Sequence, residues 1–183
     1  PFPAKKQFME FIKHRLSGVI ECIPTKYHDE RGFFYESYNQ KRFASNGIPE
    51  DFVQDNYSFS SKGVLRGLHF QHNPNGQGKL VRVMTGKALD VVVDLRKDSP
   101  TFGQHEKFVL DADKGNMLYV PIGFAHGFIA LEETIFVYKC TNFWNKEAES
   151  GIRWNDPQLG IEWGVENPIV SNKDQILPDF DPN

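Results

Sequence analysis

The stretch VLRGLHFQ, residues 64–71, is the most informative part of the sequence, and Lys79 follows it after a loop that contains glycines. The two segments read as strands joined by that loop. In a regular strand, residues three apart point to opposite faces, so Arg66 and His69 would be separated unless a bulge lies between them. Gly67 is the residue type that marks such bulges. We therefore expect a β-structure that brings an arginine, a histidine and a lysine into one cavity, as a charged, ionisable substrate would require.

Short strands recur along the chain, and turn-forming residues separate most of them, for example at residues 73–76 and 113–116. The expected strands are residues 32–38, 52–59, 65–70, 80–84, 88–95, 106–110, 117–120, 127–131 and 134–141. One helix is expected at residues 39–45, with Asn39 as its N-cap and Gly47 just beyond its end. Short strands at this spacing indicate a sandwich or barrel. The sequence therefore predicts an all-β, double-sheet jelly roll with short peripheral helices.

The length of 183 residues suits one domain with a sizeable core, and no linker, repeat or low-complexity segment divides it. We expect residues 1–183 to form a single domain, with residues 1–8 as an added or disordered extension before a start at Met9. Beyond Asn145 the chain turns repeatedly. Its large apolar side chains are expected to pack back on the body of the protein, namely Trp154, Ile161 and Trp163.

The composition argues against several classes of protein. A formal net charge of −3 does not suit a general nucleic-acid binder, which is normally basic. No apolar run approaches the ~20 residues of a membrane span, and the chain opens without a signal-peptide core. We therefore expect a cytoplasmic protein with neither a nucleic-acid nor a membrane partner. Cys22 and Cys140 fit no zinc pattern and are expected to be buried free thiols.

Two residues are candidates for proton transfer. A lone histidine is more often structural, but the cations Arg66 and Lys79 favour a neutral His69 imidazole, which accepts protons near pH 7. Tyr138 lies in the strand-like run IFVYKC, residues 135–140. It is either a core tyrosine with a satisfied hydroxyl or a neutral acid that reaches into the cavity.

His126 raises the question of a metal site. It lies in PIGFAHGF, residues 121–128, and Pro-x-Gly-x-x-His is the second signature of the cupin jelly rolls, where such a histidine often binds a metal. The first signature usually supplies His-x-His and a later glutamate, whereas this chain has His69, Phe70 and Gln71. Two histidines alone are not a typical protein metal site. We therefore expect no metal.

Eight segments together resemble one family. In order, they are DERGFF (29–34), FVQDN (52–56), VLRGLHFQ (64–71), QGKLVR (77–82), DLRKDSPTFG (94–103), PxGFAHGF (121–128), YK (138–139) and WND (154–156). The series resembles the dTDP-4-dehydrorhamnose 3,5-epimerases, and the resemblance extends from about Gly18 to Asp174. It implies a cupin jelly roll that acts as a homodimer without a metal or organic cofactor. The implied substrate is dTDP-4-dehydro-6-deoxy-D-glucose.

The resemblance also implies roles for individual residues. His69 would remove the protons on C3 and C5 of the sugar, and Asp174 would orient it. Lys79 would hold the enolate oxygen that develops at O4. Tyr138 would return a proton from the opposite face, which inverts the carbon.

The remaining implied residues bind the substrate. Arg66 would contact the pyrophosphate, where its planar fork suits the oxygens, and His126 would line the sugar pocket. Four residues are expected around the nucleotide, some of them from the dimer partner: Arg31, Glu36, Gln54 and Asn56. Glu149 and Lys173 also match the family pattern near the ligand.

Three alternatives remain open from the sequence. The first is an epimerase that acts at C3 or C5 only, on a related dTDP-4-keto-deoxysugar. The second is a metal-dependent cupin of another reaction class. The third is a jelly roll that binds a sugar without catalysis.

Overall fold

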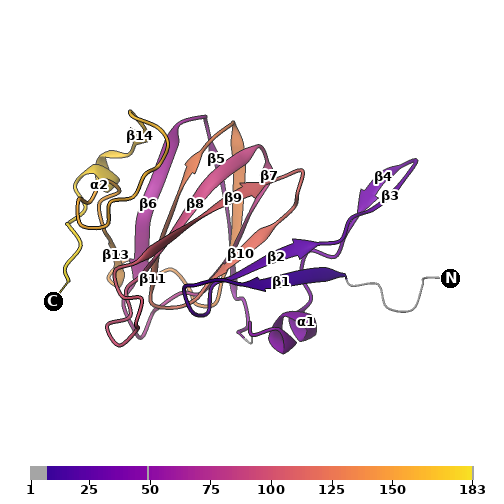
Figure 1. The fold of residues 1–183 in the computed structure, drawn as a ribbon, viewed down its shortest axis with the longest axis horizontal. Helices are drawn as coiled ribbons and strands as arrows, with labels where there is room; N and C mark the ends of the chain where they lie inside the picture. The colour runs from indigo at the N-terminus through magenta and orange to yellow at the C-terminus, as the bar shows by residue number, and fades with distance from the viewer. Residues whose placement is uncertain (1–7, 49, 183) are drawn as a thin grey trace.

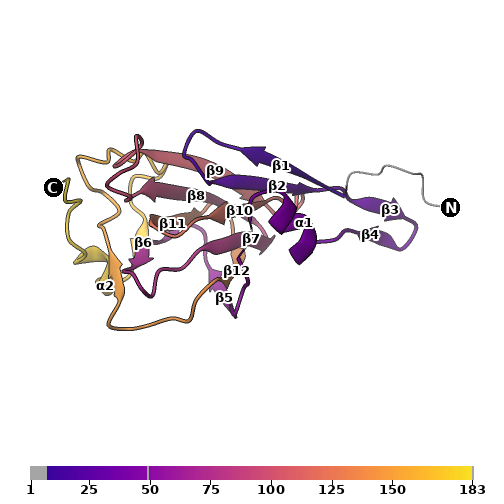
Figure 2. The same cartoon turned by 90° about the horizontal axis from the view of Figure 1, so that it is seen from below.

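The computed structural model describes residues 8–48 and 50–182. The predicted extension therefore lies, except for Phe8, outside the described residues. Two sheets face one another and form the body of the protein (Figures 1 and 2). This arrangement confirms the predicted all-β jelly roll.

The strands of the two sheets come from distant parts of the chain. The first sheet has the order β1 (Met9–Lys13), β2 (Ile20–Pro24), β10 (Met117–Val120), β7 (Lys79–Thr85), β12 (Thr134–Cys140) and β5 (Gln54–Ser60). The second has the order β13 (Glu149–Gly151), β6 (Val64–Gln71), β11 (Phe124–Ala130), β8 (Lys87–Asp94) and β9 (His105–Asp111), and β14 (Ile169–Val170) pairs in parallel with β6. A separate hairpin of β3 (Tyr27–Asp29) and β4 (Gly32–Phe34) projects from the body (Figure 1).

The main core lies between the two sheets, because alternate residues of each strand point inward. Val81 and Phe136 of the first sheet are buried against Val92 and Phe128 of the second. The rings of Phe128 and Phe136 stack in parallel with their centroids 3.9 Å apart. This aromatic pair therefore ties the sheets together directly.

The second sheet is covered on its outer face as well. Val91 and Val93 point away from the main core and pack against Trp163 and Phe180 in the C-terminal segment. Burial on both faces explains why β8 reads as an almost continuous apolar run. The prediction that Trp163 packs back on the body is confirmed, as it is for Trp154 and Ile161.

The first helix follows the predicted pattern, and its boundaries agree. Helix α1 spans Gln40–Ser45, and the side chain of Asn39 accepts a hydrogen bond from the backbone N–H of Arg42 at 3.2 Å. A second helical turn, α2 (Asn172–Gln175), was not predicted. Within the described residues, no helix is both long and apolar enough to cross a membrane. Cys22 and Cys140 are free and buried, as predicted.

Three features of the strands correct the sequence prediction. The strand predicted at residues 32–38 ends at Phe34, because the chain beyond it has left the hairpin and leads to α1. The strand predicted to follow His126 begins earlier, at Phe124, and contains the histidine. The pattern does not predict β1 or β2; these two consecutive strands pair with each other, and β2 also pairs with the distant β10.

The predicted irregularity at Gly67 is present. His126 of β11 pairs with His69 of β6, but Phe128 pairs with Arg66, so the register shifts by one residue at Gly67. Gly67 has a φ of +128°, a region that residues with a side chain rarely adopt. A Cβ atom added there would lie 2.6 Å from the Cα of Gly127. Glycine is therefore required for both its backbone angle and its close contact with β11.

We predict that Gly67→Ala destabilises the protein far more than Gly63→Ala. Both glycines have positive φ, which costs about 1–2 kcal/mol for a residue with a side chain. A Cβ added at Gly63 would meet no atom within 4 Å, whereas one added at Gly67 overlaps the backbone, which costs roughly 1–3 kcal/mol more. Urea denaturation of the two variants measures the difference. Equal losses of stability would show that close packing at Gly67 is unimportant.

Candidate active site

One cavity of about 540 Å³ collects most of the predicted site residues. It opens among strands β6, β7, β11 and β12, with β13 and α2 at one side. Eight predicted residues line it: Arg66, His69, Lys79, His126, Tyr138, Glu149, Lys173 and Asp174. Arg66 and His69 share this cavity even though they are three residues apart in one strand. The bulge at Gly67 accounts for that arrangement.

His69 is held by a buried carboxylate. Its Nε2 lies 2.7 Å from Oδ1 of Asp174, and Oδ2 of Asp174 accepts the backbone N–H of Gly67 at 3.1 Å. Asp174 itself is fixed by α2, where the Ser171 side chain caps the turn by accepting the Asp174 N–H. The second ring nitrogen of His69, Nδ1, is therefore the one available to a ligand.

The surroundings of Asp174 keep it ionised. Burial alone would raise its pKa, but the hydrogen bond and charge of His69 and the N–H of Gly67 outweigh burial and hold the pKa below its ordinary value. An ionised carboxylate accepts the Nε2 proton of a neutral imidazole. The pair can therefore present an unprotonated Nδ1 to the cavity, as a general base requires.

Tyr138 and Lys79 face each other in the same cavity. The Lys79 ammonium lies 5.9 Å from the centroid of the Tyr138 ring. Burial raises the pKa of the Tyr138 phenol, which keeps it protonated and able to donate. Burial lowers the pKa of Lys79, whereas the nearby carboxylates Asp90 and Glu149 act in the opposite direction. Burial in the same cavity thus favours the neutral phenol of Tyr138 and disfavours the ammonium form of Lys79.

Charged groups also occupy the rim of the cavity. The Arg66 guanidinium donates to the Ser60 hydroxyl and to the Phe59 carbonyl, each at 3.0 Å. Lys173 and Glu149 form an ion pair at 2.8 Å that joins α2 to β13. Within residues 8–48 and 50–182, no cluster of three or more His, Cys, Asp or Glu side chains is arranged to hold a metal ion.

Comparison with known proteins agrees with this geometry. The family model for dTDP-4-dehydrorhamnose 3,5-epimerase matches residues 13–182. The dTDP-4-dehydrorhamnose 3,5-epimerase of Shigella flexneri is 51% identical over 168 residues, which cover 91% of this chain and 93% of the relative. The chain belongs to the dTDP-4-dehydrorhamnose 3,5-epimerase family.

Two solved structures show the range of this epimerase family. A dTDP-6-deoxy-D-glucose-3,5-epimerase from Legionella pneumophila, in complex with dTDP-4-keto-L-rhamnose, has a TM-score of 0.86 and 42% identity, and covers 94% of this chain and 99% of that one. A 3′-monoepimerase from Streptomyces bikiniensis, in complex with dTDP-quinovose, has a TM-score of 0.86 and 32% identity; the match covers 91% of this chain and 86% of that one. Epimerases that act at one carbon thus share the fold.

Four of the residues predicted by resemblance to the epimerases lie outside the main cavity. Arg31 pairs with Asp29 on the projecting hairpin and is largely exposed. Glu36, between the hairpin and α1, forms an ion pair with Arg42 at 2.9 Å. The main cavity alone therefore does not account for the prediction that Arg31 and Glu36 surround a nucleotide.

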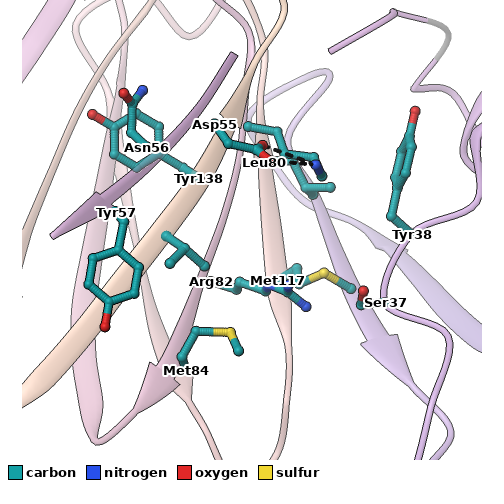
Figure 3. A pocket seen from close by; sticks show the side chains of 12 residues that line it. Ser37, Tyr38, Asp55, Asn56, Tyr57, Leu80, Arg82, Met84, Met117 and Tyr138 are labelled. Carbon is teal, nitrogen blue, oxygen red and sulfur yellow. Dashed lines mark hydrogen bonds and ion pairs between the residues drawn. The ribbon is translucent and has the colours of Figure 1, made fainter. Parts of the chain in front are cut away.

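The other two of these residues lie on β5, at the edge of the first sheet. Gln54 donates to the side-chain oxygen of Asn56 at 3.1 Å and accepts the backbone N–H of Trp144 at 2.9 Å. Asn56 lines a second cavity, of about 330 Å³ (Figure 3), and Tyr138 lines both this cavity and the main one. Neither of the two β5 residues lines the main cavity.

One residue of the site was missed by the sequence prediction. Asp90 is fully buried on β8, and its Oδ2 lies 2.7 Å from Nε2 of His126. The available signal was a single acid within the apolar run from Ala88 to Val93. A charge at such a position is rare unless it is paired, but the pattern alone does not reveal the partner on a neighbouring strand.

Proposed function

We propose that the protein converts dTDP-4-dehydro-6-deoxy-D-glucose to dTDP-4-dehydro-L-rhamnose by inverting C3 and C5. The observation that carries this proposal is the grouping of His69, held by Asp174, with Tyr138 and Lys79 in one cavity. Membership of the epimerase family and the ligand named for the Legionella structure support the same substrate.

The chemistry follows from the C4 ketone of the substrate, which acidifies the protons on C3 and C5. The neutral His69 imidazole takes one of these protons at Nδ1, and the electrons of the broken C–H bond form an enolate with its charge on O4. The Lys79 ammonium stabilises that oxygen, where a cation already in place lowers the barrier. The Tyr138 hydroxyl then protonates the carbon from the opposite face, which inverts it.

The cycle closes without net gain or loss of protons. His69 leaves the step protonated and Tyr138 leaves it deprotonated, so exchange with water restores both before the second carbon reacts. Side chains supply the base, the acid and the positive charge. We therefore propose that the reaction needs no metal or organic cofactor.

We assign the remaining residues to substrate binding, following the family pattern. Arg66 contacts the pyrophosphate, and His126 lines the sugar pocket. Glu149 and Lys173 lie near the ligand at the rim. Four residues surround the nucleotide, namely Arg31, Glu36, Gln54 and Asn56. We further propose that the protein acts in the cytoplasm.

We also propose that two copies of the chain form a homodimer. The β3–β4 hairpin projects from the body and carries the exposed aromatic residues Phe33 and Phe34. An isolated two-stranded hairpin is marginally stable in water, so packing on a second copy would account for this one. Strand β5 is a sheet edge with exposed Tyr57 and Phe59. If the hairpin of one copy packed against the β5 edge of the other, Arg31 and Glu36 of the first copy would lie near the cavity of the second.

The main alternative is an epimerase that inverts one carbon only, because the Streptomyces bikiniensis 3′-monoepimerase has the same fold. The chain is nevertheless more similar to the 3,5-epimerases, at 51% and 42% identity against 32%. We therefore favour inversion at both carbons.

Incubation with dTDP-4-dehydro-6-deoxy-D-glucose in D₂O tests the proposed function. We expect deuterium at both C3 and C5, because each carbon loses a proton to His69 and regains one that has exchanged with solvent. Proton NMR of the product measures the label at each position. Label at one carbon only would favour the monoepimerase, and label at neither would refute the proposal.

We expect His69→Ala and Tyr138→Phe to separate proton removal from inversion. Loss of the base should reduce exchange at both carbons by roughly 10²–10⁴-fold, the usual contribution of a general base. Tyr138→Phe keeps the ring and the base, so it should retain more exchange than inversion. Deuterium uptake and product formation, measured in parallel, give the two rates. Equal loss of exchange in both variants would contradict the assigned roles.

Mixing two inactive variants tests the dimer proposal. If Arg31 serves the partner's cavity, a heterodimer of Arg31→Ala and His69→Ala contains one complete site, so mixing and refolding them together should restore activity. If Arg31 serves its own cavity, or only monomers form, no complete site arises. Activity no higher than that of the separate variants would exclude the exchange of Arg31 between copies.

A further inference from the structure

A second histidine–carboxylate pair lies opposite the first. His126 and His69 are directly paired residues on the adjacent antiparallel strands β11 and β6. Both line the cavity, and both rings contact a carboxylate through Nε2 at 2.7 Å, His69 with Asp174 and His126 with Asp90. Side chains of directly paired residues lie close together on one face of a sheet. The proposed mechanism uses the first pair and leaves the buried acid of the second without a role.

Packing does not explain why Asp90 is an acid. Its side chain is completely buried, and among the described residues its Oδ1 has no hydrogen-bond partner. A buried carboxylate with an unpaired oxygen costs stability, and an apolar residue of similar size is often better tolerated. The negative charge that an aspartate can carry is what distinguishes it from a neutral residue of similar size at this position.

Lys79 is the group that this charge can serve. Burial lowers the pKa of Lys79, and Asp90 is one of the acids that oppose this effect. The titratable and charged groups that line the cavity or act on Lys79 come from six elements: Arg66 and His69 of β6, Asp90 of β8, His126 of β11, Tyr138 and Cys140 of β12, Glu149 of β13, and Lys173 and Asp174 of α2.

The carboxylates of this set differ in how many hydrogen bonds and ion pairs they already make. Both oxygens of Asp174 hold other groups, His69 and the N–H of Gly67. Glu149 is paired with Lys173. Asp90 contacts only the imidazole of His126 among the described residues, and that ring can be neutral. Burial raises the pKa of Asp90, whereas its interactions with His126 and Lys79 favour the ionised form. Asp90 and Lys79 therefore each favour the charged form of the other.

We propose that Asp90 is a positioning residue for the enolate end of the site, which holds His126 with its Nε2–H turned inward and its Nδ1 toward the sugar. In this position an ionised Asp90 also favours the protonated form of Lys79. This inference rests on the proposed function, in which Lys79 must carry its charge when O4 becomes an oxyanion. Asp90 does not contact the substrate. It acts through the two residues that do.

Asp90→Asn tests the charge without changing the shape of the side chain. We expect kcat to fall on the order of 10- to 100-fold, by analogy with the loss of a carboxylate that orients a metal-binding histidine. KM should change less than kcat, because the residues assigned to the nucleotide and the pyrophosphate do not include the partner of Asp90, His126. Loss of the negative charge lowers the pKa of Lys79 further, so the alkaline limb of the kcat–pH profile should move to lower pH. An unmoved limb would overturn the inference.

Asp156→Asn is the matched control. Asp156 is also a buried aspartate, and its carboxylate accepts the backbone N–H groups of Gln158, Leu159 and Phe180 away from the cavity. This variant should lose stability but keep the alkaline limb in place. A shift of the limb in both variants would show that loosening of the fold, rather than the charge of Asp90, moves it.

A measurement on the wild-type protein keeps the inference testable if Asp90→Asn does not fold. In protein labelled with ¹⁵N-histidine, the neutral form of His126 should carry its proton on Nε2, with its signals assigned by their loss in His126→Gln. The opposite tautomer would overturn the positioning role whether or not the protein is active. A wild-type protein inactive in the D₂O assay would instead refute the proposed function and, with it, the role at the enolate.

Discussion

The hydrogen bond between His69 and Asp174 is the interaction on which the candidate site depends. It joins β6 to a helical turn 105 positions later in the chain. That turn reaches the cavity only because the C-terminal segment folds back over the outer face of the second sheet, where Trp163 and Phe180 are buried. Apolar packing far from the cavity therefore sets the position of the Asp174 carboxylate. The orientation of His69 depends in turn on the burial of the C-terminal segment.

The bulge at Gly67 connects this hydrogen bond to the rest of the cavity. It lets Arg66 and His69 share a face, and its N–H donates to the same carboxylate that holds His69. The residues proposed as phosphate anchor and base, Arg66 and His69, can thus lie on one strand, three residues apart, without a loop between them. Precise spacing is easier to maintain on a strand than on a loop, because the ladder on either side fixes the backbone.

Much of the fold and most of the cavity follow from the sequence, for reasons that also explain the errors. Strands such as β10 and β12 are predictable because their side-chain pattern is local. Strand β2 joins the sheet through β10, a partner almost a hundred residues away that no local pattern contains, and β1 joins only through β2. Asp90 was missed for the same reason, since its histidine lies on another strand. Arg31 matches the family motif, but a motif carries no distances, and within one chain it lies off the cavity.

Desolvation explains why the acid and the cation of the site need different support. Burial raises the pKa of Tyr138 and lowers that of Lys79, so in both cases it favours the uncharged form. For a proton donor that form is the useful one, and the phenol needs no charged neighbour. For Lys79 in its proposed role beside an enolate oxygen, the uncharged form is the wrong one, and a nearby negative charge favours the ammonium form. A carboxylate buried behind the cavity, where solvent does not screen it, meets that need at the cost of its own desolvation.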